Sequence, residues 1–167
     1  MTNTARRAFL ASVFPGLALA APRVSAQAPA QAPRPGAGQA EPARKKVYRK
    51  LTPTSVTVAG NPLYSPEVSF GNLVFVSGKG PGTAFKGDIT AQTKNVIDQI
   101  EESLKLAGSS MEKVLKVNVY LTDIRNFPGM NEAYIGRFGG DPPVRTTVAV
   151  TAIPDGMLVE IECIASI

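Results

Sequence analysis

Hydrophobic and polar positions recur at regular intervals from residue 47 to the end of the chain, and they predict a series of strands and helices. Between Val114 and Leu121, apolar residues at 117, 119 and 121 alternate with polar ones at 116, 118 and 120, which is typical of a strand with one buried face. The same reasoning predicts strands at 68–70, 73–78, 144–150 and 157–165, and a further short strand at 47–51. The run 73–78 is apolar almost throughout, so we expect that strand to be buried on both faces.

Two segments show the helical period instead. Apolar residues fall on one face from Ile89 to Ala107, with Asp88 as the expected N-cap and Gly108 as the expected end. A second helix is expected to start at Pro128 and to run to about Phe138. Loops are expected at 52–66 and 79–87, and the second of these lacks the glycine and lysine spacing of a phosphate-binding loop.

The order of these elements predicts an α+β fold. Gly71-Asn72 joins two short strands as a hairpin turn, whereas the helices connect later strands as crossovers. We therefore expect a mixed β-sheet with two helices packed on one face. The other face is expected to carry a polar set that suits contact with a partner subunit: Lys116, Asn118, Tyr120, Arg145 and Glu160.

The N-terminal quarter has a different character. Residues 1–26 are predicted to be an export signal, because Arg6-Arg7 precedes an apolar stretch that is too short to span a bilayer. The run Arg-Arg-Ala-Phe-Leu resembles the twin-arginine signature, and Val24-Ser25-Ala26 supplies a small-residue cleavage site. This predicts a periplasmic or secreted protein, with no stable membrane insertion after the signal is cleaved.

Residues 27–43 are rich in alanine, proline and glutamine and are predicted to form a disordered linker, which leaves residues 44–167 as one domain. The net charge of +5 arises largely before the domain core, with a basic cluster at 44–50. That cluster could contact anionic lipid or nucleic acid, but a solvated segment is the more common case. Beyond residue 50 the charges nearly balance, so nucleic-acid binding is not expected.

The residue types that are missing narrow the possible chemistry. The chain contains no histidine, which removes serine–histidine and cysteine–histidine catalysis and most zinc sites. A single cysteine, Cys163, excludes a disulfide within the chain, and its place on an apolar strand face predicts a buried thiol. Catalysis would have to use carboxylates, hydroxyls, backbone groups or bound water, and we expect no metal and no cofactor.

Arg145 and Glu160 are the strongest candidates for a site. Arg145 follows Pro142-Pro143 at the head of a strand, where a fixed guanidinium can hold a carboxylate with two hydrogen bonds. From this stretch alone, an ion pair with a carboxylate of the same chain is the more common explanation. If strands 144–150 and 157–165 form an antiparallel hairpin, Arg145 would lie near Glu162 or Ser166, and Thr147 near Glu160. A partly buried Glu160 would have a raised pKa and could act as a general base.

Several short motifs, in their order and spacing, resemble those of the Rid (YjgF) family of enamine/imine deaminases. The motifs are Gly71-Asn72-Leu73-Val74-Phe75-Val76-Ser77-Gly78, Asp88-Ile89-x-Ala91-Gln92-Thr93, Ala107-Gly108-Ser109-Ser110, Val114-x-Lys116-Val117-x-Val119-Tyr120-Leu121-Thr122-Asp123, Asn131-Glu132-x-Tyr134, Pro142-Pro143-x-Arg145 and Val159-Glu160-Ile161-Glu162. The resemblance covers residues 64 to 165. It implies a chorismate-mutase-like fold and a homotrimer with three sites at subunit interfaces.

The resemblance also implies the reaction and the residues that perform it. The family hydrolyses reactive 2-imino and 2-enamine acids, of the 2-aminoacrylate and 2-iminopropionate type, to 2-oxo acids and ammonia without a cofactor. By this resemblance Arg145 binds the substrate carboxylate and Glu160 orients and activates water. The other residues expected around the substrate are Tyr64, Ser77, Gly78, Asn131 and Thr147.

Two positions depart from the family pattern, since Thr147 stands where a cysteine is frequent and Lys79 where a glutamine is frequent. These departures make a non-catalytic trimer that binds small carboxylates the alternative hypothesis. An endoribonuclease or protein-binding role is a weaker alternative, because the domain is nearly neutral and lacks histidine.

Overall fold

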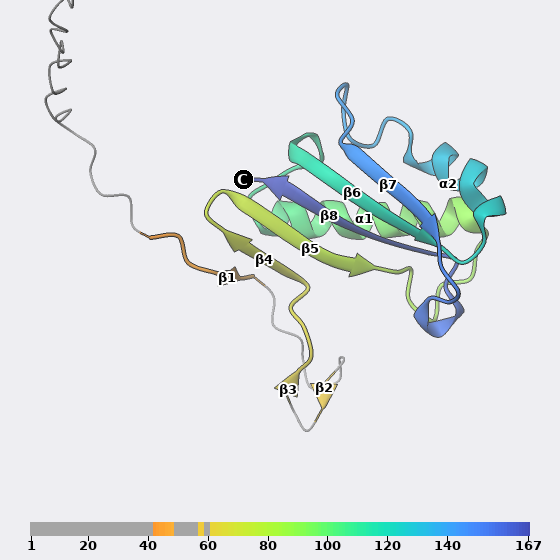
Figure 1. Ribbon diagram of the computed structural model, residues 1–167, viewed down its shortest axis with the longest axis horizontal. Coiled ribbons are helices and arrows are strands. Elements are labelled where there is room, and N and C mark those ends of the chain that lie inside the picture. Colours follow the sequence, from red (N-terminus) through yellow and green to blue (C-terminus); the bar gives the residue numbers. More distant parts are fainter. Residues whose placement is uncertain (1–41, 49–56, 59–60) are drawn as a thin grey trace, which may run out of the picture. The chain divides into compact units, whose positions relative to one another are not determined.

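The computed structural model describes residues 42–48, 57–58 and 61–167, and these residues build a six-stranded sheet in the order β1-β4-β5-β8-β6-β7 (Figure 1). The predicted export signal, and the predicted linker up to residue 41, lie outside the described residues. No described helix is long and apolar enough to cross a membrane.

The strands agree with the sequence pattern except at the start of the domain. The sheet contains β1 (Lys46–Val47), β4 (Glu67–Phe70), β5 (Leu73–Lys79), β6 (Val114–Leu121), β7 (Val144–Ala149) and β8 (Val159–Ser166). A separate two-stranded sheet, β2 (Thr57–Val58) with β3 (Asn61–Pro62), lies in the segment that was expected to be a loop. The β6–β7 pair is parallel and the other pairs are antiparallel, so the sheet is mixed as predicted.

Local sequence signals account for the hairpin and for the long helix. Gly71 adopts a φ of 60° in the β4–β5 turn, a conformation that glycine reaches at no steric cost. Helix α1 (Ile89–Leu106) begins where the Asp88 carboxylate accepts a hydrogen bond of 2.8 Å from the Ala91 N–H. It is followed by Gly108 with a φ of 81°, so both of its predicted ends are confirmed.

The second helix is shorter than the sequence indicated. Helix α2 spans Phe127–Tyr134, whereas the expected end was near Phe138. Ile135 leaves the helical conformation with a ψ of 135°, and Gly136 turns the chain with a φ of 74°. Phe138 is nevertheless buried, so its apolar character reflects packing after the helix has ended. Single-turn 3-10 helices occupy Met111–Lys113, Ile124–Asn126 and Pro154–Gly156.

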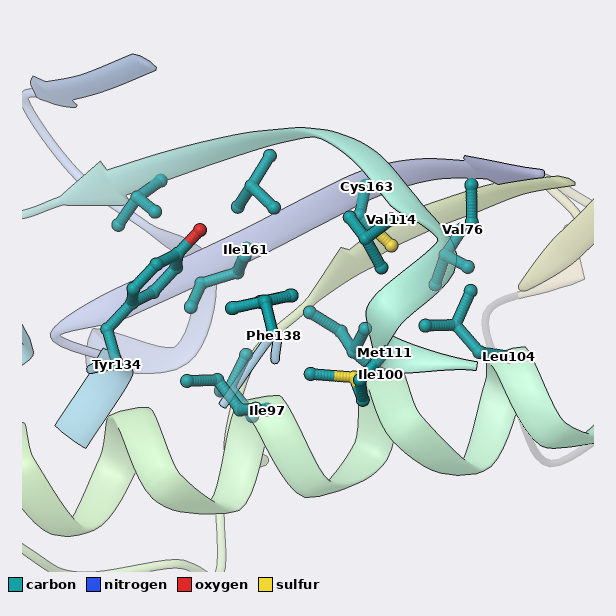
Figure 2. Packing of buried hydrophobic residues seen from close by; sticks show 14 of the residues in the cluster. Val76, Ile97, Ile100, Leu104, Met111, Val114, Tyr134, Phe138, Ile161 and Cys163 are labelled. Atoms are coloured by element: carbon teal, nitrogen blue, oxygen red, sulfur yellow. The ribbon is translucent and has the colours of Figure 1, made fainter. Parts of the chain in front are cut away.

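The core lies between α1 and one face of the sheet (Figure 2). Ile97, Ile100 and Leu104 of α1 have no exposed side-chain surface, and they pack against the apolar face of β5, β6 and β8. Cys163 belongs to this core, and burial raises the pKa of its thiol to about 12. The thiol is therefore protonated at neutral pH, in agreement with the predicted structural role.

The opposite face of the sheet carries none of the described helices, and this changes the description of β5. Val74 and Val76 are buried under α1, but Phe75 keeps 38% of its surface exposed on the open face. The prediction that this strand is buried on both faces is therefore wrong for the single chain. Aromatic and aliphatic side chains on an uncovered sheet face are typical of a surface that contacts another molecule.

Candidate functional site

Arg145 projects from the face of β7 that carries the helices. Its register partner on β6 is Val117, whose side chain is buried in the core, and paired residues point to the same side of a sheet. Lys116, Asn118 and Tyr120 pair with the alternate residues of β7 and lie on the open face. The prediction that Arg145 shares a sheet face with Lys116, Asn118 and Tyr120 is wrong. Alternation along β7 groups its side chains into two sets, and only the pairing with β6 decides which set takes which face.

Helix α2 holds the Arg145 guanidinium in place. Its central carbon lies 4.5 Å from the ring centroid of Tyr134 and 5.6 Å from that of Phe127. One guanidinium nitrogen also donates to the Met130 sulfur, 3.9 Å away. Stacking on aromatic rings orients a guanidinium without neutralising it.

The ion pair that the local sequence favoured for Arg145 is not formed. Among the residues that the structure describes, no carboxylate oxygen lies within 4.0 Å of this guanidinium. Arg145 instead lines a pocket of about 650 Å³ whose walls include Asn131, Tyr134, Ile135 and Pro143. A fixed cation at the wall of a largely apolar pocket can bind the carboxylate of a small ligand.

Two further polar groups lie close to this arginine in the fold. Thr147 follows Arg145 by two residues and lies on the same face of β7, and its hydroxyl is buried without a hydrogen-bond partner. The Tyr134 hydroxyl is likewise buried and unbonded, and burial raises its pKa to about 12. Thr147 is not among the residues that line the pocket.

Glu160 lies in a different pocket, of about 500 Å³, together with three other residues that the sequence singled out. These are Tyr64, Ser77 and Gly78. The Ser77 N–H donates to the Pro66 carbonyl at 2.9 Å, which holds the loop that carries Tyr64 against the end of β5. The Ser77 hydroxyl is buried without a hydrogen-bond partner and is therefore able to accept or donate to a ligand.

Gly78 is required for the position of the Glu160 side chain. A β-carbon placed on Gly78 would lie 2.8 Å from Glu160 Cδ and 3.1 Å from Cγ, and it would approach the carboxylate oxygen still more closely. The Glu160 carboxyl group thus rests against the backbone of Gly78, in space that any other residue would fill.

The surroundings of Glu160 favour its protonated form. Burial raises the pKa of its carboxyl group, and the negative charge of Glu162 raises it further. Glu162 is itself fixed on the open face of the sheet, where one of its oxygens accepts from Asn118 at 2.7 Å and from the Tyr120 hydroxyl at 3.0 Å. A carboxylate with a raised pKa can accept a proton from water and return it near neutral pH.

Lys79 does not face this pocket. Its register partner is Ile161, which points into the core, and its ammonium lies 3.9 Å from Glu67 Oε2. The Lys79 and Glu67 side chains are 11% and 0% exposed, so they form a buried ion pair next to the core. The lysine that departs from the family pattern therefore belongs to a buried ion pair and does not line the Glu160 pocket.

The predicted site residues thus fall into two groups within one chain. β7 and β8 do not pair, because β6 lies between them, so the predicted Arg145–Glu162 and Thr147–Glu160 neighbours are wrong. Glu160 pairs with Tyr120 on the open face, whereas Arg145 lies on the helix face. The sequence did not predict that Pro154 and Met157 line the Glu160 pocket, or that aromatic rings of α2 stack on Arg145. These side chains are neither polar nor reactive in a way that a sequence pattern would mark.

Comparison with known proteins identifies the fold. The sequence matches the family described as Endoribonuclease L-PSP over residues 54–167. A RutC family protein of Pyrococcus abyssi is 44% identical over 107 residues, which cover 61% of this chain and 84% of that protein. The 2-iminobutanoate/2-iminopropanoate deaminase of Rattus norvegicus is 34% identical over 124 residues, which cover 71% of this chain and 90% of that protein.

A crystal structure agrees with these matches. The structure of a Rid-family protein of unknown function from Yersinia pestis superposes with a TM-score of 0.65 at 33% identity, and the match covers 74% of this chain and all of that one. The mixed sheet with two helices on one face is thus the chorismate-mutase-like architecture of these proteins. The chain belongs to the Rid family, also called the YjgF or L-PSP family.

Proposed function

We propose that this protein is a hydrolytic deaminase that converts reactive 2-imino and 2-enamine acids to 2-oxo acids and ammonia. The observation that carries the proposal is the position of the Arg145 guanidinium, which is held by α2 and lines a pocket. It has no carboxylate neighbour among the described residues. The similarity to a rat protein named as a 2-iminobutanoate/2-iminopropanoate deaminase supports the same chemistry.

The charges of the two pockets suit the two ends of such a substrate. The Arg145 pocket has a cation and, in the part of the chain that the structure describes, no acidic residue in its wall, and it would bind the substrate carboxylate. Among the described residues, the wall of the Glu160 pocket contains Glu160 and Asp155 and no cation. This pocket would favour a protonated imine, which is positively charged. A 2-iminium acid carries these two charges on adjacent carbons.

The reaction then requires one water and no other reactant. An enamine substrate first takes a proton on carbon 3 and becomes the iminium ion. The water oxygen bonds to the iminium carbon while Glu160 accepts one of its protons, which gives a neutral carbinolamine at that carbon. Glu160 returns the proton to the amino nitrogen, and the carbon–nitrogen bond breaks with its electrons going to nitrogen, so that ammonia leaves. The hydroxyl oxygen forms the carbonyl double bond as its proton passes to Glu160, which gives the 2-oxo acid and balances the proton that the enamine took up.

A single chain does not bring Arg145 and Glu160 to the same substrate, because they lie on opposite faces of the sheet. We propose that the protein is a homotrimer in which each site combines the Arg145 pocket of one chain with the Glu160 pocket of the next. Exposed apolar residues on the sheet support such contacts: Phe70 is 55% exposed, Val148 is 42% exposed and Phe75 is 38% exposed.

The first experiment measures ammonia release from freshly generated 2-iminopropionate, with the native protein beside Arg145→Ala and Glu160→Ala. We expect turnover by the native protein and a large loss in each variant. If the native protein is folded and trimeric but does not accelerate hydrolysis, the proposed reaction is wrong, and binding of pyruvate would then favour the non-catalytic carboxylate-binding alternative.

A mixture of the two inactive variants tests the shared site. When Arg145→Ala and Glu160→Ala chains are unfolded together and refolded as mixed trimers, about one site in four pairs a native Arg145 with a native Glu160. Activity should therefore return to about a quarter of the native value. A site built within one chain, or roles other than those assigned, would leave the mixture as inactive as its components.

We also propose that residues 1–26 export the protein to the periplasm or beyond. The support is the sequence alone, with Arg6-Arg7 before an apolar stretch. Replacement of both arginines by lysine should leave the precursor in the cytosolic fraction of a bacterial host that has a twin-arginine pathway. Equal export of the native and the lysine forms would refute this assignment.

A further inference from the structure

One buried side chain connects the strand that carries Glu160 to the loop that faces it. Gln92, in the first turn of α1, is only 6% exposed, and both ends of its carboxamide are bonded to backbone groups. Its oxygen accepts from the Leu158 N–H at 2.9 Å, and its nitrogen donates to the Gly87 carbonyl at 2.9 Å. An amide with both functions satisfied in a buried site has a single well-defined orientation.

The bond to Leu158 fixes the start of β8. The Leu158 carbonyl accepts from the Thr122 N–H at 3.1 Å, so both backbone groups of Leu158 have a partner. Glu160 follows two residues later, and its side chain rests against Gly78. The direction in which Glu160 leaves the strand therefore depends on how Leu158 is held.

The bond to Gly87 anchors the far end of the loop that reaches the Glu160 pocket. Gly87 closes the glycine-rich loop that begins at Gly80, and Gly80 lines the Glu160 pocket. A second amide of α1, Gln99, donates to the Gly80 carbonyl at 3.0 Å. A β-carbon on Gly80 would lie 2.7 Å from Met157 Cε, so this loop touches the segment just before β8.

We propose that Gln92 is a positioning residue for the reaction, which holds the Glu160 strand and the facing loop in the one arrangement where the Glu160 carboxyl rests on Gly78. This inference rests on the proposed function, in which Glu160 moves the proton of the attacking water. Gln92 lies outside the walls of the Glu160 pocket, so it acts through Glu160 and not on the substrate.

The test compares Gln92→Met with the matched variant Gln99→Met. Methionine has nearly the length of glutamine and similar helix propensity, but its side chain supplies no amide. Gln92→Met loses the bonds to β8 and to the loop, whereas Gln99→Met loses the bond to the loop at Gly80 and the one to Asn95.

For Gln92→Met we expect kcat for 2-iminopropionate to fall about tenfold, with KM within about twofold of the native value, because the carboxylate anchor at Arg145 is unchanged. Gln99→Met keeps the bond to Leu158 and should therefore lower kcat by less than Gln92→Met does. Equal losses in the two variants, or a rise of KM that accounts for the whole effect in Gln92→Met, would overturn the proposal.

A second readout does not depend on turnover. The carboxyl group of Glu160 can be titrated by carbon-13 NMR in the native protein and in Gln92→Met. The neighbouring residues Glu162 and Tyr120 are the same in both. We expect the Glu160 pKa to fall toward the ordinary glutamate value in Gln92→Met, because a displaced side chain gains access to water. An unchanged Glu160 pKa would show that Gln92 does not position this group, even if the native protein proved not to be a deaminase.

A third test measures hydrogen exchange in the native protein, so it does not depend on the folding of any variant. The Leu158 amide proton should exchange with solvent far more slowly than that of exposed Asp155, because Gln92 accepts it. Exchange of both amides at the same rate would refute the bond on which the proposal depends.

Discussion

Replacement of Gly78 by alanine should strongly reduce the proposed deaminase activity while leaving the fold intact. The new methyl group would lie 2.8 Å from Glu160 Cδ, whereas carbon atoms in ordinary contact are about 3.5–4.0 Å apart. The Glu160 carboxyl must therefore withdraw by about 1 Å. Gly78 is not among the residues with positive φ, so alanine fits its backbone conformation without strain.

A displacement of this size is enough to abolish efficient proton transfer. A misplacement of about 1 Å at a reacting group can cost about 100-fold in rate, which corresponds to about 2.7 kcal/mol of barrier. We therefore expect kcat for 2-iminopropionate to fall about 100-fold in Gly78→Ala, and the denaturation midpoint to change little.

The assay is ammonia release over the spontaneous rate of imine hydrolysis, and Glu160→Ala supplies the control. If Gly78→Ala acts by displacing Glu160, adding it to Glu160→Ala should cause no further loss. Additive losses in the double variant, or native activity in Gly78→Ala, would show that the contact between Gly78 and Glu160 does not set the geometry of the reaction.

Three further outcomes follow from the same structure. Arg145→Lys should raise KM for 2-iminopropionate at least about tenfold, because lysine lacks the planar group that stacks on α2 and binds a carboxylate with two bonds; an unchanged KM would exclude the anchor role. Glu162→Gln should lower the pKa of Glu160 by removing a like charge, so the acid limb of the pH profile of kcat should move to lower pH. An acid limb at the same pH in this variant would show that the limb does not report the ionisation of Glu160. Ile100→Ala should cost about 2–5 kcal/mol in the free energy of unfolding measured with urea, since Ile100 is fully buried, and a cost below about 1 kcal/mol would contradict the packing in Figure 2.

Local sequence signals were sufficient for the strands from β4 to β8 and for α1. Asp88 and Gly108 mark the ends of α1 because capping and positive φ are properties of single residues and their immediate neighbours. Ser77 and Gly78 end the predicted strand of β5, and the structure places both in the pocket that holds Glu160. The resemblance to the Rid family, read from short motifs, was confirmed by relatives and by the fold.

The relation between Arg145 and Glu160 was decided by tertiary structure alone. Alternation along a strand correctly placed Thr147 with Arg145 and Glu162 with Glu160, but it does not say which face of one strand matches which face of another. That depends on the order of strands in the sheet, and β6 separates β7 from β8 and pairs with β7 in parallel. Strand order is set by contacts between residues far apart in the chain, and no local pattern records them.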